Sequence, residues 1–134
     1  MKCETISDGG TRLAMVVRNA DWQPGLNFIS ADTDYIQAGI WGYAKGHKLA
    51  AHRHLAVPRQ IDRTQEVLFV KQGRLRADIY DEADALVKSV ELEAGDVIVL
   101  LAGGHGYEML ADGTMVLEVK NGPYVGADKD RKRI

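Results

Sequence analysis

Three histidines and one glutamate have the residue types and the spacing to bind a metal ion. His52 and His54 are separated by one residue, so on a β-strand both imidazoles point to the same face. Glu66 begins the apolar run EVLFV, where a carboxylate is costly unless it is paired or bound to a cation. His105 lies in LLAGGHGYEML, an apolar segment interrupted by glycines. We therefore predict that these four side chains, from three strands, bind one ion.

This donor set carries one negative charge before metal binding. It suits a single divalent first-row transition metal ion, which could be Fe, Mn, Ni, Zn or Cu. Three or four protein ligands leave coordination positions for water or a bidentate substrate, as is typical of a catalytic metal site. No residue beyond the ligands is an obvious general base, so the catalytic residue is unknown at this point.

Four further side chains are candidates for binding the substrate. Trp41 and Gln37 share one face of a predicted strand over 35–43, and they offer a flat apolar ring and a hydrogen-bonding amide. Arg63 offers a positive charge for a carboxylate or phosphate. Tyr107 has the same strand parity as His105. The alternative for both aromatic side chains is ordinary core packing.

The rest of the chain predicts the strands that would position these side chains. About ten short runs of alternating or β-branched apolar residues are separated by turn residues, with no helical periodicity of useful length. This pattern predicts an all-β barrel or sandwich. We expect a strand over 48–54 that carries the histidine pair, and a hairpin turn at 111–113. Segment 55–65 is predicted to be a loop, either a lip of the barrel mouth or a tolerated surface insertion.

The segment 46–73 resembles the first sequence motif of the cupin family. That motif reads Gly, five residues, His-x-His, three or four residues, Glu, six residues, Gly. His52, His54 and Glu66 occupy its ligand positions, with eleven residues between the second histidine and the glutamate. The segment 95–109 is similar to the second cupin motif, which reads Gly, five residues, Pro-x-Gly, two residues, His, three residues, Asn.

In this second segment the chain departs from the motif at three places. Leu101 replaces the proline, Met109 stands where asparagine is usual, and the spacer before His105 is one residue short. A one-residue slip on a strand turns a side chain to the other face, and the neighbouring glycines could absorb such a slip as a bulge. His105 is therefore retained as a predicted ligand.

The resemblance implies a double-stranded β-helix, or jelly-roll barrel, that forms a single cupin domain over residues 1–134. The pattern is similar to small cupins of carbohydrate and surface-polysaccharide metabolism. It implies a metal-dependent isomerase or epimerase acting on a sugar or sugar derivative, or an oxygenase. The alternatives are a non-catalytic module that binds metal and sugar, and a metal-free sugar-nucleotide ketoisomerase that uses one histidine as base. Glu66 argues against the last of these.

Composition limits the partners. The chain has 134 residues, 46% of them hydrophobic, and a net charge of −2 with no basic patch for nucleic acid. No stretch approaches the length of a membrane span and no leader is apparent, so we expect a cytoplasmic protein that binds a small molecule. Cys3 is the only cysteine, which excludes an internal disulfide. We also expect a homodimer, in which the run RLAMVVR (12–18) adds a strand to a partner's sheet.

Overall fold

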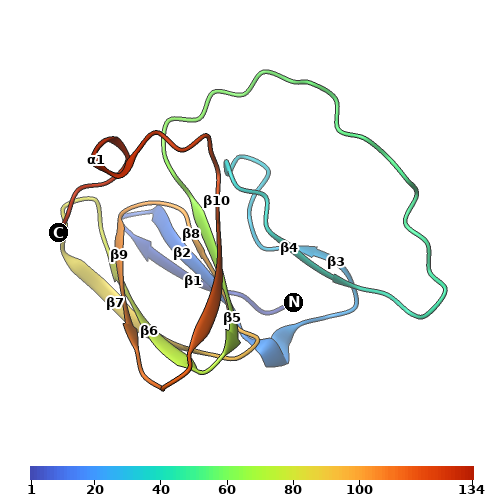
Figure 1. Ribbon diagram of the computed structural model, residues 1–134, viewed down its shortest axis with the longest axis horizontal. Coiled ribbons are helices and arrows are strands. Elements are labelled where there is room, and N and C mark those ends of the chain that lie inside the picture. Colours follow the sequence, from blue (N-terminus) through green and yellow to red (C-terminus); the bar gives the residue numbers. More distant parts are fainter.

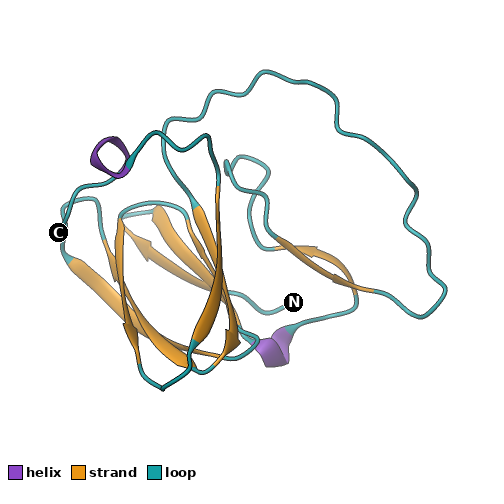
Figure 2. Cartoon of the chain, viewed as in Figure 1, coloured by secondary structure: helices purple, strands orange, loops and turns teal.

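The computed structural model describes residues 1–134, and antiparallel β-strands make up nearly all of its regular structure (Figure 1 and Figure 2). The larger sheet has the order β1-β2-β8-β5-β10, formed by β1 (Glu4–Asp8), β2 (Thr11–Val17), β8 (Val97–Leu100), β5 (Glu66–Gln72) and β10 (Met115–Lys120). The smaller sheet has the order β7-β6-β9, formed by β7 (Leu86–Glu93), β6 (Arg74–Tyr80) and β9 (Gly104–Met109). A separate two-stranded ribbon pairs β3 (Gly25–Phe28) with β4 (Gly39–Gly42).

The helices are two short pieces. One is a 3-10 turn, η1 (Asn19–Asp21), and the other is a single α-helical turn near the C-terminus, α1 (Ala127–Asp130). Neither has the length and apolar character needed to cross a membrane.

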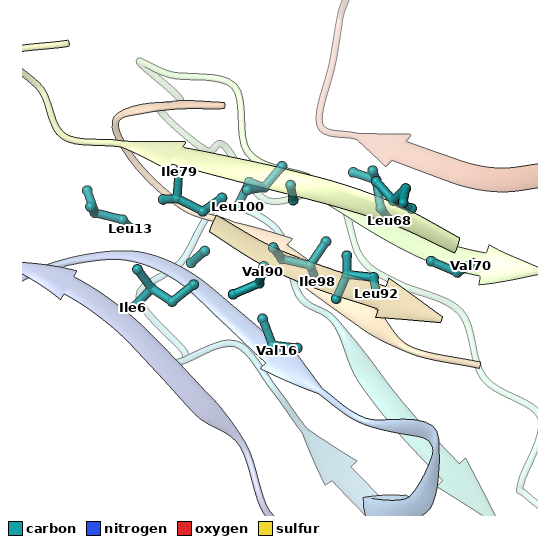
Figure 3. Close-up of a cluster of buried hydrophobic side chains, with 13 residues drawn as sticks. Ile6, Leu13, Val16, Leu68, Val70, Ile79, Val90, Leu92, Ile98 and Leu100 are labelled. Atoms are coloured by element: carbon teal, nitrogen blue, oxygen red, sulfur yellow. The ribbon is translucent and has the colours of Figure 1, made fainter. Parts of the chain in front are cut away.

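The two larger sheets face each other and bury the main core between them (Figure 3). The alternation of the strands explains this arrangement, because every second residue of each strand points to the same face. The five-stranded sheet contributes Val16, Leu68 and Ile98, and the three-stranded sheet contributes Ile79 and Leu92; all five side chains are buried. Hydrophobic alternation read from the sequence therefore predicts the all-β class correctly.

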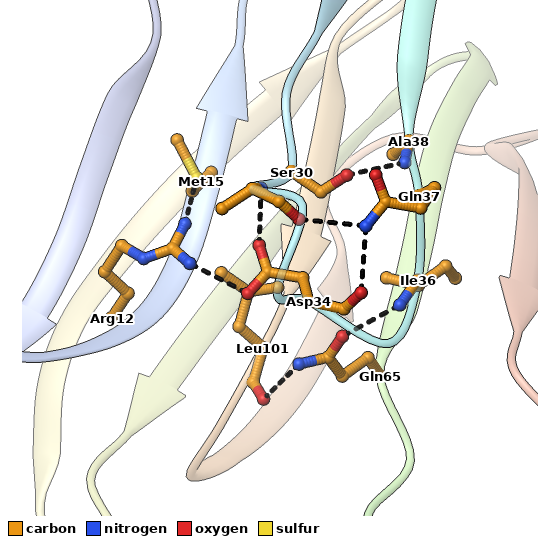
Figure 4. A network of polar contacts seen from close by, with 10 residues as sticks. Arg12, Met15, Ser30, Asp34, Ile36, Gln37, Ala38, Gln65 and Leu101 are labelled. Carbon is orange, nitrogen blue, oxygen red and sulfur yellow. Dashed lines mark hydrogen bonds and ion pairs between the residues drawn. The ribbon is translucent and has the colours of Figure 1, made fainter. Parts of the chain in front are cut away.

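The β3-β4 ribbon covers part of the outer face of the five-stranded sheet. Ile40 packs with Val97 and Val99 in a second hydrophobic cluster on the side opposite the main core. A polar network attaches the chain between the two ribbon strands to the sheet (Figure 4). In it Arg12 pairs with Asp34 at 2.8 Å.

The buried side chain of Gln65 extends this attachment. Its Oε1 accepts a hydrogen bond from the Ile36 amide at 3.0 Å, and its Nε2 donates to the carbonyl oxygen of Leu101 at 3.2 Å. The segment just before β5 is thereby joined both to the ribbon and to the end of β8.

Two turns, one of them the turn predicted at 111–113, connect the sheets instead of closing hairpins. The turn at 111–113 lies between β9 and β10, but β9 pairs with β6 while β10 pairs with β5. Gly73 similarly joins β5 to β6, which lie in different sheets, and it has a φ of +82° that favours glycine. A Cβ at position 73 would also lie 2.6 Å from Cα of Thr114. Turn residues predict a change of chain direction but not which strands then pair, so the hairpin prediction at 111–113 is wrong.

The strands differ from the sequence predictions in three further ways. Residues 48–54 form no strand. The sequence pattern does not predict the polar strand β1, although it pairs with β2 along its length. Because β2 lies between β1 and β8, the run 12–18 is interior to its own sheet and its edges are not free to join a partner's sheet. The sheets are antiparallel as expected for the fold class, but they do not close into a continuous barrel.

The last strand, β10, has an unexpected orientation. Its register with β5 sets Lys120 opposite Glu66 and Glu118 opposite Leu68, so its polar residues point between the sheets. Its apolar residues Leu117 and Val119 point outward and are 58% and 48% exposed. A polar patch is therefore brought into the interior at this end of the molecule.

Candidate functional site

Glu66, the first residue of β5, lies on the inner face of the five-stranded sheet. Leu68 and Val70 follow it on the same face and are part of the main core. The Glu66 side chain is only 7% exposed. A carboxylate so deeply placed must have partners to offset the cost of removing its charge from water.

Two basic side chains provide those partners from neighbouring strands. Lys120 Nζ of β10 lies 2.8 Å from Glu66 Oε1. His105 Nε2 of β9 lies 3.2 Å from Glu66 Oε2. Because β9 belongs to the three-stranded sheet, the His105 contact crosses the space between the sheets. In Figure 1 all three strands lie in the body of the molecule, away from the wide loop between β4 and β5.

The ionisation of Glu66 is decided by these contacts. Burial raises the pKa of its carboxyl group, but the contacts with His105 and Lys120 outweigh burial and lower that pKa from 4.5 to about 2. The hydrogen bond to Glu66 likewise raises the pKa of Lys120. Glu66 is therefore a carboxylate and Lys120 an ammonium at neutral pH.

Tyr107 lies two residues after His105, on the same face of β9. The two rings are 5.2 Å apart between centroids. Burial, with the nearby charges of Glu66 and Glu118, raises the pKa of the Tyr107 hydroxyl well above its usual value. The hydroxyl therefore stays protonated and is available as a hydrogen-bond donor.

Two buried polar atoms at this point have no hydrogen-bond partner of good geometry. One is the Tyr107 hydroxyl and the other is Oε2 of Glu66. Oε2 is within ion-pair distance of His105 Nε2, at 3.2 Å, but the contact is poorly aligned for a hydrogen bond. An unsatisfied buried polar group costs about 1–3 kcal/mol. The Tyr107 hydroxyl is an unpaired donor and Glu66 Oε2 is an unpaired acceptor, and both lie close to His105. A ligand that carries a hydroxyl group can hydrogen-bond to both of them.

We call Glu66, His105, Tyr107 and Lys120 the interior cluster. Access to it is open at the histidine and the lysine, whose side chains are 30% and 34% exposed. Glu118 Oε1 lies 3.4 Å from Lys120 Nζ and adds a second negative charge. With a neutral histidine, the cluster and Glu118 together carry a net charge of about −1, which favours an uncharged polar ligand over a phosphate.

His52 and His54 lie in a different part of the structure. They belong to residues 43–63, which we call the arm; every residue of the arm is exposed, and none is in a strand or helix. The two imidazoles are edge to face with ring centroids 5.3 Å apart, and His52 Nδ1 is 3.1 Å from the Ala50 carbonyl oxygen. The arm extends away from the two sheets (Figure 1).

The four predicted metal ligands therefore do not form one coordination sphere. Glu66 and His105 are in contact, whereas His52 and His54 are not joined to them, and no group of three or more potential ligands is present. Lys120 also places an ammonium against the carboxylate that a metal ion would need. The residues as arranged do not fit the ion, and we derive no chemical step through one. Metal binding stays a prediction of the sequence motif.

The predicted substrate-binding residues are likewise separated. Gln37 is exposed and donates through Nε2 to the carbonyl oxygens of Ala31 and Asp34, at 2.8 and 2.9 Å (Figure 4). Trp41 is 58% exposed on the ribbon, because Ile40 occupies the inward position of that strand. Both side chains therefore lie outside the space between the two larger sheets, and their role in substrate binding stays a prediction.

Arg63 lies at the end of the arm. Its guanidinium is 3.5 Å from the carboxylate of Glu82. Of the four predicted substrate-binding residues, only Tyr107 lies beside Glu66 and His105.

Sequence reasoning missed Lys120. The relevant signal is the alternation in MVLEVK, where Val116, Glu118 and Lys120 share one face. The more apolar face of that strand would be assigned inward from the sequence, and the structure has the opposite orientation. No protein-family model, curated protein or solved structure is significantly similar to this chain, so the site is interpreted from its own geometry.

Proposed function

We propose that this chain is a jelly-roll protein of the cupin type that binds a small polar molecule at the interior cluster and transfers protons on it. The observation that carries the proposal is the Glu66–His105 contact, 3.2 Å between sheets, with the buried Tyr107 hydroxyl beside it. The motif resemblance supports a sugar or sugar derivative as the ligand. The proposed reaction is an isomerisation or epimerisation that needs no metal ion. From the sequence alone Glu66 argues against a metal-free reaction, and the proposal answers this by giving Glu66 the role of partner to His105 instead of metal ligand.

His105 is the proposed general base. An ionised carboxylate only accepts hydrogen bonds, so in a neutral His105 the nitrogen that faces Glu66, Nε2, carries the proton and Nδ1 keeps a free lone pair. We propose that the 3.2 Å contact, which is poorly aligned without a ligand, becomes an aligned hydrogen bond when the substrate binds. Glu66 is thus a positioning residue, which orients the imidazole and stabilises the imidazolium after proton transfer. A histidine oriented in this way by a carboxylate is a recurrent acid–base arrangement.

The reaction removes and returns one proton. His105 Nδ1 takes a proton from the carbon next to the sugar carbonyl, and the carbonyl oxygen gains negative charge as the enolate forms. The Tyr107 hydroxyl donates a hydrogen bond to that oxygen. In an isomerisation the proton returns to the former carbonyl carbon, while the hydroxyl proton of the deprotonated carbon passes to the former carbonyl oxygen, so that the carbonyl forms on the neighbouring carbon. In an epimerisation the proton returns to the opposite face of the same carbon. Neither reaction consumes a cosubstrate.

Exchange of substrate hydrogen with solvent tests this proposal whichever of the two products forms. The protein is incubated in D₂O with a panel of aldoses, ketoses and keto-sugar nucleotides, and deuterium at the carbon next to the carbonyl is followed by proton NMR. We expect catalysed exchange with at least one sugar, and a loss of about 100-fold or more in His105→Asn, the typical contribution of a general base.

His47→Asn is the matched control, because His47 is exposed in the arm and stacks on Tyr43 at 4.1 Å between ring centroids. This variant should exchange at the wild-type rate. Exchange that is absent with the whole panel, or equal in wild type and His105→Asn, contradicts the proposed function.

A further inference from the structure

The outer face of β10 is an exposed apolar strip. Met115, Leu117 and Val119 are 53%, 58% and 48% exposed, and the last two lie directly opposite Phe69 and Val67 of β5. β10 is also the edge strand of its sheet, with backbone groups unpaired on one side. Proteins that remain monomeric protect such edges with charges, bulges or a covering segment. β10 has a register shift between Met115 and Val116, but its charged residues Glu118 and Lys120 point inward, so the outward residues Leu117 and Val119 stay uncovered.

The arm also carries apolar side chains that its own chain leaves exposed. It is exposed along its whole length, and four of its large apolar side chains face solvent: Leu49, Leu55, Val57 and Ile61 are 57%, 75%, 56% and 40% exposed. In Figure 1 the arm runs from β4 to β5 as a wide loop outside the body of the chain. The arm therefore does not bury these side chains against its own sheets.

The total surface supports burial by a second molecule. The chain has a mass of 14.8 kDa and exposes 9322 Å². A compact monomer of that mass exposes roughly 7,000 Å². The difference, roughly 2,300 Å² per chain, is well above the roughly 800 Å² that each partner contributes to a stable interface of standard size.

The distribution of charge makes a second copy of this chain a suitable partner for the arm. The arm contains five basic residues (Lys45, Lys48, Arg53, Arg59 and Arg63) and one acidic residue, Asp62, so its net charge is +4. Because the whole chain carries −2, the remainder carries −6. An arm from one chain is thus electrostatically complementary to the body of another.

We propose that two copies of this chain form a symmetric dimer in which each arm lies across the apolar strip of its partner's β10. The contact is reciprocal, so a two-fold axis relates the chains and covers both apolar surfaces at once. This interface differs from the one expected from the sequence, since the run 12–18 takes no part in it. It also does not depend on the function proposed for the interior cluster.

Sedimentation and light scattering test the dimer. We expect wild type to have about twice the 14.8 kDa chain mass at micromolar concentration. Leu117→Asp on the strip and Leu55→Asp in the arm should each weaken the dimer by about 100-fold or more, because each would bury an unpaired carboxylate. Leu86→Asp is the control: Leu86 is 57% exposed on β7, the edge strand of the other sheet, and its substitution should leave the dimer intact.

Circular dichroism of each variant verifies the fold, since all three positions are exposed in the single chain. A wild type that is monomeric at every concentration overturns the proposal, because the arm is then covered by its own chain or by another protein. A dimer that survives either Leu117→Asp or Leu55→Asp, or that is lost equally in Leu86→Asp, also overturns it.

Cross-linking identifies the contact itself. Chains carrying Cys3→Ser with Leu55→Cys are mixed with chains carrying Cys3→Ser with Leu117→Cys, and a bismaleimide is added. We expect a covalent heterodimer in much higher yield than when Leu86→Cys replaces Leu117→Cys. Equal yields of heterodimer in the two mixtures would show that the arm does not contact β10 of the partner.

Discussion

The two halves of one sequence motif have different surroundings in this molecule. Glu66 is almost completely buried at the start of a central strand and contacts two basic side chains. His52 and His54, in the same motif, lie in the exposed arm without regular structure. The comparison teaches that a motif assigns chemistry to residue types, while the strand pairing decides which of those residues can act together.

The difference has a physical origin in backbone hydrogen bonding. β5 is paired on both sides, with β8 and with β10, so the direction of the Glu66 side chain is set by its register. The arm has no partner strand, and a two-residue spacing places side chains on one face only in an extended, paired strand. A spacing of two residues therefore places side chains on one face in β5 but not in the arm.

Glu66→Gln should produce the largest effect in the interior cluster. Loss of the carboxylate removes the group that orients His105, so we expect the rate of hydrogen exchange into the sugar to fall by about 100-fold. A shift in the pH–rate profile of the residual activity should accompany the fall, since the charge next to the base is lost. Glu118→Gln is the control, because Glu118 contacts Lys120 at 3.4 Å and is not in contact with His105. An unchanged rate and profile in Glu66→Gln would contradict the positioning role.

Glu66 should also make stability depend on pH. Its pKa is about 2 in the folded protein against an ordinary value of 4.5. This difference corresponds to roughly 3 kcal/mol of unfolding free energy. Because the folded pKa is lowered, the contribution is fully present above pH 4.5 and is lost as the pH falls toward 2. Urea unfolding between pH 7 and pH 2 should show this loss in wild type, and a matching curve for Glu66→Gln would argue against it.

Lys120→Met should have a smaller effect. Lys120 pairs with Glu66 at 2.8 Å, but its side chain is 34% exposed and partly screened by water. We expect the free energy of unfolding at pH 7 to fall by about 1 kcal/mol. Lys132→Met is the matched control, since the Lys132–Asp84 pair is at 2.7 Å and the lysine is 77% exposed. That variant should change stability by about 0.5 kcal/mol or less, and equal losses in the two variants would show that burial of Glu66 adds nothing to its pair.

Part of this account could be predicted from the sequence. Alternating apolar residues predict the all-β class and most strands, because half-buried strands repeat every two residues. Glu66, His105 and Tyr107 are functional candidates from the sequence because each lies in an apolar strand next to chemistry-bearing neighbours. These predictions depend only on local pattern.

The remainder depends on long-range pairing, which local pattern does not contain. The contact of His105 with Glu66 requires β9 and β5 to lie in facing sheets. The inward direction of Lys120 requires the register of β10 against β5, which is opposite to the one that its apolar residues suggest. The absence of a strand at 48–54 reflects the absence of a pairing partner, which a run without proline or glycine does not reveal.

Metal content sharpens the comparison between the two regions. One divalent ion per chain stays a prediction of the motif, and elemental analysis of protein purified without chelator would measure it. If His52, His54, Glu66 and His105 shared one ion, His54→Ala and His105→Asn would remove it equally. The separation in the structure predicts that His105→Asn leaves the content unchanged whatever His54→Ala does. An equal loss of metal from both variants would show that the arm and the interior cluster bind the same ion, contrary to the separation in the structure.

The most direct test of the central claim is hydrogen exchange into the sugar by a variant that lacks both arm histidines. The claim is that the interior cluster works without the arm, since Glu66, His105 and Tyr107 lie together while His52 and His54 lie apart from them. In D₂O, after treatment with chelator, the double variant His52→Ala/His54→Ala should retain the wild-type rate within about twofold, far from the loss expected on removing a general base. A fall as large as that caused by His105→Asn would contradict the account and make the arm part of the site.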